Sequence, residues 1–308
     1  MSAPPASADP VALSVERPFG TLHGTLERPA RLVRAAALIV PGSGPTDRNG
    51  NSAFGLSTDA YRLLAEALAA EGIATLRIDK RGIGNSGGDP NAVSLSAYRE
   101  DTAAWADLLR AQTGAPCIWL IGHSEGGILA LDAAALPDVC GLVLLATPGR
   151  ILGAVMRDQI AAQPTLAPTL PAFDRALAKL IATGTPDPIG LPPGLAAIFG
   201  PATRAYLREL VMTNPAALLA ASDLPVLMIH GDADLQVPPS EADPLAAARP
   251  DASRLTLPGL THTLKLATPA DDSPAALTAA SFATYADPSL PLHDRLGPAI
   301  AGFILAPR

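Results

Sequence analysis

The stretch Cys117–Leu136, CIWLIGHSEGGILALDAAAL, decides the fold. It opens with a short unbroken apolar run, typical of a buried parallel strand, and closes with a run of helical length. Between the two runs lies Gly-His-Ser-Glu-Gly, residues 122–126. A G-x-S-x-G sequence at a strand-to-helix turn is a nucleophile elbow, in which a strained backbone lifts the serine hydroxyl above the sheet. We therefore predict that Ser124 is a nucleophile; a plain Ser/Gly turn without chemistry is the alternative.

Strand-like and helix-like segments alternate on both sides of this turn. The alternating apolar pattern of Val11–Pro29 predicts two antiparallel strands. Further strands are predicted at Ala35–Val40, Ile73–Ile78, Gly141–Ala146, Pro225–Ile229 and Ser253–Leu257, and helices at Thr58–Ala70, Ser94–Gln112, Gly126–Leu136 and Asp294–Leu305. This alternation predicts an α/β fold with a mostly parallel central sheet flanked by helices.

Proline, with 32 residues in a chain of 308, is distributed unevenly. Only Pro90 and Pro116 lie between Thr46 and Leu136, whereas nine prolines lie between Arg150 and Ser222. Proline stops helices and removes sheet donors, so the second stretch favours short helices over additional strands. We predict a helical cap insertion over residues 150–222, and a catalytic core formed by residues 1–149 and 223–308.

The composition excludes several classes of protein. Apolar residues make up 48% and charged residues 17% of the chain, which excludes a disordered protein and a coiled coil. The net charge is −7 and the few lysines form no basic patch, so nucleic acid is not expected as a partner. No apolar run is long enough to span a membrane. The sequence carries no signal for an oligomeric state.

The expected cellular location depends on the first residues and on the cysteines. MSAPPASADP has neither a basic nor an apolar signal region, so we expect a cytoplasmic protein by default. A mature periplasmic form given a new Met would have the same features. The two cysteines, Cys117 and Cys140, each begin an apolar run, and we expect buried reduced thiols rather than a disulfide.

An elbow serine needs a histidine base, which in this fold follows the serine and an acid in the chain. Three histidines follow Ser124. His262, in PGLTHTLK, comes directly after a predicted strand, where a loop can reach over the sheet. His230 ends a strand and is expected to be a hydrogen-bonded structural residue, and His293 is expected at the surface or as a helix cap. We predict that His262 is the base, with His123 packed beside the elbow and His23 structural.

The acid is expected after the penultimate strand, in HGDADLQVP, which holds Asp232 and Asp234. The first aspartate of such a loop commonly caps a turn, which favours Asp234 as the acid. The loop after the preceding strand, ATPGR, contains no acidic residue. His230 and the two aspartates also form a His-x-Asp-x-Asp sequence, but one imidazole and two carboxylates without further partners make a weak metal site.

The oxyanion of an acyl transfer needs two backbone donors. The amide of Glu125, at the start of the helix after the elbow, is the expected first donor. The second is expected from the Gly/Pro loop after the third strand, where small residues let the backbone approach a substrate. We predict the Ser43 amide, with Gly44 as the alternative and a plain turn as the structural explanation.

A further glycine-rich loop, GIGNSG at residues 82–87, matches the dinucleotide-binding sequence G-x-G-x-x-G. A dinucleotide site requires the last glycine to open a helix. Here Gly88-Asp89-Pro90-Asn91 follows, so a loop continues. No nucleotide, metal or other cofactor is therefore expected.

These residues together resemble the α/β-hydrolase superfamily, in the bacterial serine carboxylesterase and serine-aminopeptidase-like branch. The resemblance covers nearly the whole chain and is carried by VPGSGPTDRNGN, DKRGIGNS, GHSEGG, HGDADLQVP and PGLTHTLK. It implies an α/β-hydrolase fold, and the spacing around Asp234 resembles the acid loop of the family. It also implies structural roles behind the site for Asp47, Arg48, Asp79 and Arg81.

The expected function is hydrolysis of carboxylic esters of short to medium acyl chains by a Ser124–His262–Asp234 triad through an acyl-enzyme. An aminopeptidase or amidase, a lactonase or a thioesterase on the same triad is the alternative, and a non-catalytic small-ligand receptor is the alternative from another class. The chain carries no acidic cluster for a peptide amine, which favours the esterase. The bulky aromatic residues available near a mouth, with core packing as the other possibility, are Phe54, Phe173, Phe199 and Tyr206.

Overall fold

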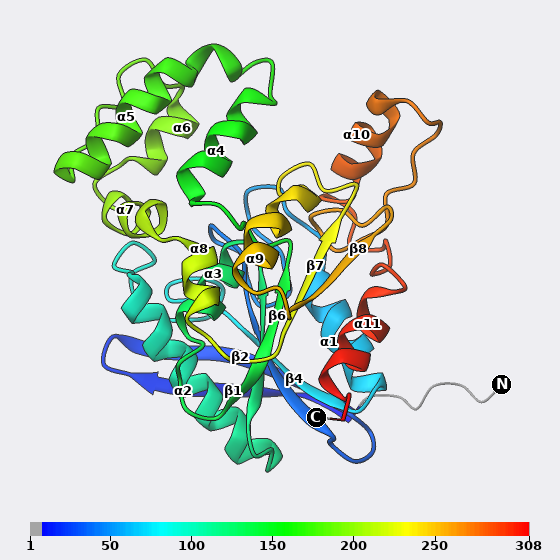
Figure 1. Cartoon of the computed structure of the whole chain (residues 1–308). Coiled ribbons are helices and arrows are strands. Elements are labelled where there is room, and N and C mark those ends of the chain that lie inside the picture. Colours follow the sequence, from blue (N-terminus) through cyan, green and yellow to red (C-terminus); the bar gives the residue numbers. More distant parts are fainter. Residues whose placement is uncertain (1–7, 308) are drawn as a thin grey trace.

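One sheet organises the computed structural model, which describes residues 8–307 (Figure 1). Its 8 strands lie in the order β1-β2-β4-β3-β5-β6-β7-β8. β1 and β2 form an antiparallel hairpin at one edge, and β3 to β8 run parallel. The strands are β1 (Ala8–Arg17), β2 (Gly20–Arg28), β3 (Ala35–Val40), β4 (Ile73–Ile78), β5 (Ile118–His123), β6 (Val139–Leu145), β7 (Val226–Gly231) and β8 (Ser253–Leu257). The predicted mostly parallel sheet is confirmed.

Helices cover both faces of this sheet because successive residues of a buried strand point to opposite sides. In β3, Leu38 and Val40 join one core cluster, whereas Ala37 and Ile39 join the other. The first cluster lies under α2 (Leu95–Thr113), α3 (Glu125–Asp132), α8 (Pro215–Ala220) and α9 (Ala242–Ala248). The second lies under α1 (Ala60–Ala70) and α11 (Leu296–Ile304). The α/β architecture is thus a three-layer sandwich with its functional edge at the carboxyl ends of the strands.

A group of helices between β6 and β7 stands apart from the sheet (Figure 1). These are α4 (Leu152–Ala161), α5 (Leu170–Thr183), α6 (Pro193–Ile198) and α7 (Arg204–Met212). They have a small core of their own, in which the rings of Phe173 and Phe199 meet edge to face at 5.7 Å. The last helix of the stretch, α8, instead buries Leu219 in the core of the sheet. The separately packed part of the insertion therefore ends before α8.

The helix α10 (Pro274–Ala283) was not expected from the sequence. The Ser273 hydroxyl accepts a hydrogen bond from the Ala276 amide at 3.1 Å, and Pro274 occupies the first turn, both typical of a helix start. Its one buried residue, Ser281, donates to the Ala233 carbonyl at 3.0 Å. This bond ties α10 to the loop that carries Asp234.

Within residues 8–307, no helix has the length and apolar character needed to cross a membrane. Residues 1–7 of the leader MSAPPASADP, on which the expected location rested, lie outside the described residues.

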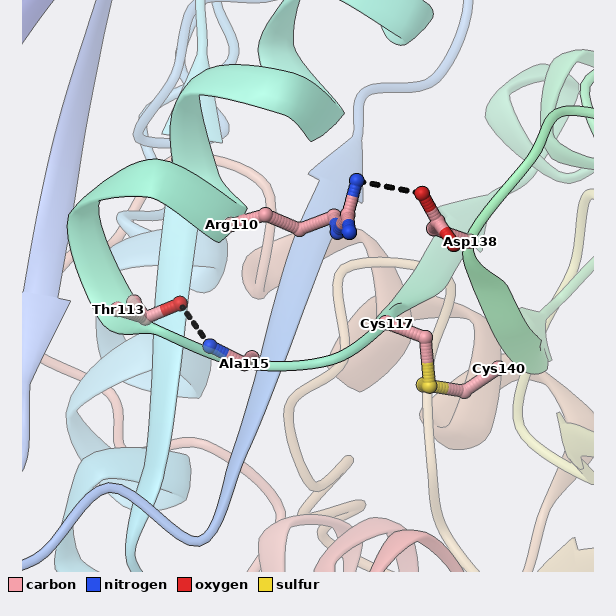
Figure 2. Close-up of a disulfide and its surroundings, with 6 residues drawn as sticks. All are labelled: Arg110, Thr113, Ala115, Cys117, Asp138 and Cys140. Carbon is pink, nitrogen blue, oxygen red and sulfur yellow. Dashed lines mark hydrogen bonds and ion pairs between the residues drawn. A yellow bond between two sulfur atoms is a disulfide. The ribbon is translucent and has the colours of Figure 1, made fainter.

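The prediction for the cysteines was wrong: Cys117 and Cys140 form a disulfide, with 5.3 Å between their Cα atoms (Figure 2). Cys117 directly precedes β5 and Cys140 lies in β6. The register between these strands shifts between Ile118 and Trp119, so that Cys140 is skipped in the ladder. The sequence hides this pairing because it depends on two strands being neighbours and on the irregular register where they begin. The bond closes the β5–α3–β6 unit that contains the elbow.

Replacing both cysteines, Cys117→Ser with Cys140→Ser, is expected to lower the free energy of unfolding by about 3 kcal/mol. The bond links residues with a sequence separation of 23, and its loss frees that loop in the unfolded chain. For this chain length the corresponding fall in Tm is roughly 5 °C. Calorimetry of the double variant should match calorimetry of the reduced wild type. Two free thiols in the unreduced, denatured wild type would show that the bond does not form.

Candidate active site

Ser124 occupies the turn between β5 and α3 with φ 55° and ψ −123°. A positive φ is strained for a serine, and the surrounding backbone holds it there. The Ser124 amide donates to the Leu145 carbonyl at 2.8 Å, and the Gly127 amide donates to the Ser124 carbonyl at 3.0 Å. A side chain at Gly122 or Gly126 would collide with backbone, since a Cβ on Gly126 would lie 2.1 Å from the Val40 carbonyl oxygen. The predicted elbow geometry is therefore present.

The loops after β7 and β8 bring Asp234 and His262 together. Nδ1 of His262 lies 2.8 Å from Oδ2 of Asp234, and both residues are buried. The other oxygen, Oδ1, accepts from the amides of Gln236 and Val237 at 2.8 and 2.9 Å. Burial alone would raise the pKa of Asp234, but His262 and the two amides outweigh it and hold that pKa below its usual range. An ionised Asp234 keeps the His262 proton on Nδ1 and leaves Nε2 free to accept one.

His123 connects this histidine to the loop after β3 through buried hydrogen bonds. Its Nε2 lies 2.9 Å from the His262 carbonyl oxygen and its Nδ1 lies 2.7 Å from Oη of Tyr61. Oη of Tyr61 in turn accepts from the Gly42 amide at 3.0 Å. Burial, reinforced by the nearby His262, lowers the pKa of His123 to about 3, so the ring is neutral.

The neutral His123 ring fixes the donor and the acceptor of each hydrogen bond between Gly42, Tyr61, His123 and His262. The His262 carbonyl can only accept, so His123 carries its proton on Nε2 and presents a lone pair on Nδ1. Tyr61 therefore donates to His123 while it accepts from Gly42. Sequence reasoning placed His123 beside the elbow but missed Tyr61, which reads as a core residue of an amphipathic helix.

Lys80 fixes the loop after β3 from the other side. Its Nζ donates to the Gly42 carbonyl at 2.6 Å. Burial lowers the pKa of Lys80, although the Glu125 charge opposes that shift. A trans peptide points its carbonyl and its following N–H in opposite directions, so this bond also sets the direction of the Ser43 amide. Glu125 is the first residue of α3, and its carboxylate accepts a hydrogen bond from Oη of Tyr206 at 2.7 Å.

The residues expected to act as a scaffold form ion pairs and turns behind the site. Two nitrogens of Arg48 donate to Oδ2 of Asp79 at 2.6 and 3.0 Å, and its amide donates to Oδ1 at 2.7 Å. Arg81 pairs with Asp101 on α2. Oδ1 of Asp47 accepts from the amides of Asn49 and Asn51. These contacts support structural roles.

The other histidines lie outside the His262–Asp234 pair. His230 is buried in β7 with Nε2 3.0 Å from the Thr147 carbonyl oxygen, as expected of a structural residue, and burial lowers its pKa. His293 was expected at the surface or as a cap. It is buried rather than at the surface, with Nε2 3.0 Å from the Pro258 carbonyl oxygen, and its Nδ1 accepts from the Arg295 amide at 3.3 Å just before α11. The loop that folds back over β8 covers it, which the local sequence does not show. His23 lies in β2 and is half-buried.

Two cavities meet at Ser124. A small one of about 150 Å³ is lined by Ser124, His262, Tyr61 and Tyr285 among others. A large one of about 840 Å³ lies between the sheet and helices α4, α6 and α7, and its lining includes Ser124 and Tyr206. Phe54, 87% exposed, also lines the large cavity. Of the candidate aromatic residues, Phe173 and Phe199 belong instead to the core of the insertion.

No group of three or more His, Cys, Asp or Glu side chains in residues 8–307 is arranged to hold a metal ion. The GIGNSG loop does not open a helix, since α2 begins only at Leu95. A side chain at Gly84 would collide with the side chain of Asp79, and a side chain at Gly82 would collide with Gly88 and Pro90. These two glycines therefore serve local packing.

The chain is similar to several known hydrolases. A family model described as Hydrolase_4, serine aminopeptidase S33, matches residues 53–188. Esterase EstD of Thermotoga maritima is 27% identical over 209 residues, which are 66% of this chain and 47% of that protein. The chain thus spans about half the length of the curated relative it matches.

Solved structures share the fold across most of the chain. The structure of Est1E from Butyrivibrio proteoclasticus with ferulic acid bound has a TM-score of 0.58 at 22% identity, and covers 89% of this chain and 96% of its own. Proline iminopeptidase from Mycobacterium smegmatis has a TM-score of 0.56 at 19% identity, with coverage of 88% and 97%. Identities this low establish the fold alone.

The neutral His123 ring makes folding depend on pH. Its folded pKa of about 3 lies below the unfolded value near 6.5, so between these values the unfolded chain binds more protons. Stability from this group is full above about pH 6.5 and falls by up to about 1.4 kcal/mol per pH unit as the pH drops toward 3. Denaturant titrations should show a shallower pH dependence for His123→Gln. A ring found protonated by ¹⁵N NMR at pH 5 would contradict the assignment.

Proposed function

We propose that the chain belongs to the α/β-hydrolase superfamily, in its esterase and serine-aminopeptidase-like branch, and that it hydrolyses carboxylic esters of short to medium acyl chains. The observation that carries this proposal is the buried His262–Asp234 pair, of which His262 lines one cavity together with the strained Ser124. Ester hydrolysis needs a nucleophile, a base and an acid in this relation. The insertion between β6 and β7 serves as a cap over the site.

In the proposed reaction, Nε2 of His262 takes the Ser124 hydroxyl proton while Oγ forms a bond to the ester carbonyl carbon. Asp234 holds His262 in position and stabilises the imidazolium. His262 then gives the proton to the leaving alkoxide as its bond to the carbonyl carbon breaks, which leaves an acyl-enzyme. Water repeats these steps, and the acid departs while Ser124 regains its proton.

The negative oxygen of both tetrahedral intermediates needs donors that are already in place. The amides of Ser43 and Glu125 supply them in this proposal, with Gly44 as the alternative to Ser43. The Lys80 bond to the Gly42 carbonyl, which sets the direction of the Ser43 amide, supports the choice of Ser43. Each such donor typically contributes about 2.7–4 kcal/mol to transition-state stabilisation.

An ester fits the site better than a peptide with a free amino terminus. Among the described residues lining the two cavities, Glu125 supplies the one carboxylate, and Tyr206 already donates to it. The amine of Lys80 lines the same cavity. A substrate ammonium would have to displace the tyrosine and approach the lysine, whereas an ester brings no charge.

The disulfide indicates the type of cellular compartment in which the protein functions. Disulfides form and persist in oxidising compartments and are rare in the cytosol. We therefore propose an oxidising location for this chain, in place of the cytoplasm that the first residues suggested by default.

Ser124→Ala should lower kcat/KM for methyl butyrate at least about a thousandfold, since the acyl-enzyme can no longer form. The fold should remain, with an unchanged circular dichroism spectrum. Hydrolysis is followed by titration of the released acid, and a fluorophosphonate probe should label the wild type at Ser124. A wild type that hydrolyses no ester and resists the probe would instead favour a ligand receptor.

Asp234→Asn should lower kcat by about a hundredfold to ten-thousandfold, because an amide no longer enforces the His262 tautomer or stabilises the imidazolium. Asp232→Asn is the matched control. Asp232 lies on the same loop, is exposed, and accepts from the Gly259 amide through Oδ1. Equal losses in the two variants would mean that the acid has been assigned wrongly.

A further inference from the structure

The two cavities at Ser124 share a narrow boundary. Ser43, Ser124 and Gln236 line both of them. Gln236 is held at this boundary by bonds to both sides: its Nε2 donates to Oη of Tyr285 at 2.5 Å, and its carbonyl accepts from Gln159 of α4 at 3.0 Å. When an ester carbonyl carbon lies at Ser124, its acyl chain and its alkoxy group would therefore extend into different cavities.

The position of the base tells which substituent goes where. His262 lines the small cavity, and it is absent from the described lining of the large one. The leaving oxygen must lie within hydrogen-bond reach of the base that protonates it. The alcohol part of the ester therefore lies on the His262 side, and the acyl part points to the other side.

The linings of the chambers match this division. Around the large cavity stand apolar side chains of the cap and of the loops beneath it, including Ile83, Met156 and Leu207. Around the small cavity stand smaller residues and ring side chains, including Thr58, Thr263 and His262. The small cavity thus suits a short alcohol and the water that replaces it, whereas the large cavity can take apolar surface out of water.

We infer that the substrates are esters of bulky apolar acids with small alcohols, the acyl chain in the 840 Å³ cavity under the cap and the alcohol in the 150 Å³ cavity at His262. The inference rests on the proposed esterase function and adds the shape of its substrate.

Two isomeric esters test it: methyl octanoate places the long chain on the acyl side, and heptyl acetate places it on the alcohol side. They share one molecular formula, so differences in overall hydrophobicity are small. Methyl octanoate should have a kcat/KM at least about thirtyfold higher, which corresponds to burying two to three more methylene groups at roughly fourfold each.

Variants of the two chambers give a second readout. Met156→Trp narrows the large cavity and should lower activity on methyl octanoate at least about tenfold, and by a larger factor than it lowers activity on methyl acetate. Met212→Trp is the matched control, because Met212 is 55% exposed on the cap and lies outside both described linings. Leu56→Ala widens the small cavity and should raise activity on heptyl acetate.

Equal rates on the two isomers, or a faster rate on heptyl acetate, would overturn the inference while leaving the esterase function intact. A loss on methyl octanoate from Met212→Trp as large as that from Met156→Trp would overturn the assignment of the acyl chain. Failure of the wild type on methyl acetate, methyl butyrate and both isomers would overturn the proposed function itself.

Discussion

The strained turn at Ser124 is the constraint on which the rest of the site depends. With φ at 55°, the serine can stay there only while Gly122 and Gly126 let the β5–α3 turn press against the end of β3. The Leu145 carbonyl of β6 holds the turn from the other side. The order of the central strands therefore positions Ser124, the proposed nucleophile, and the disulfide closes the same β5–α3–β6 unit at its far end. Stability and chemistry depend on one structural unit.

The elbow also links the two loops that must act together on a substrate. His123, which precedes the nucleophile, bonds to the backbone of His262 and, through Tyr61, to Gly42. Each polar group in this series of hydrogen bonds, from Gly42 to the His262 carbonyl, has a partner, so burying these groups costs little free energy. An unpaired buried group would cost about 1–3 kcal/mol. Because His123 is neutral, the bonds all run in one direction. A movement of the loop after β3 is thus resisted by the same bonds that hold the backbone of His262.

Much of this arrangement can be predicted from the sequence because its signals are local. The elbow, the acid loop and the loop of His262 each follow a strand, and the edge of a parallel sheet gathers the ends of its strands. What the sequence did not show depends on contacts between distant segments. The Cys117–Cys140 pairing needs a register shift, the burial of His293 needs a loop that folds back, and the role of Tyr61 needs two loops at once.

The division between chemistry and substrate choice follows from the same difference between local and distant contacts. The proposed base, the proposed acid and the small cavity are built on the sheet, where strand ends leave little freedom. The large cavity is closed by an insertion with its own core, held to the sheet by few polar bonds, such as that from Tyr206 to Glu125. Substitutions in the core of that insertion can change the volume of one chamber without moving Ser124. Substitutions around the small cavity would disturb His262 and Tyr61, which line it. Under the inferred substrate placement, the fold restricts the alcohol part of the ester more tightly than the acyl part.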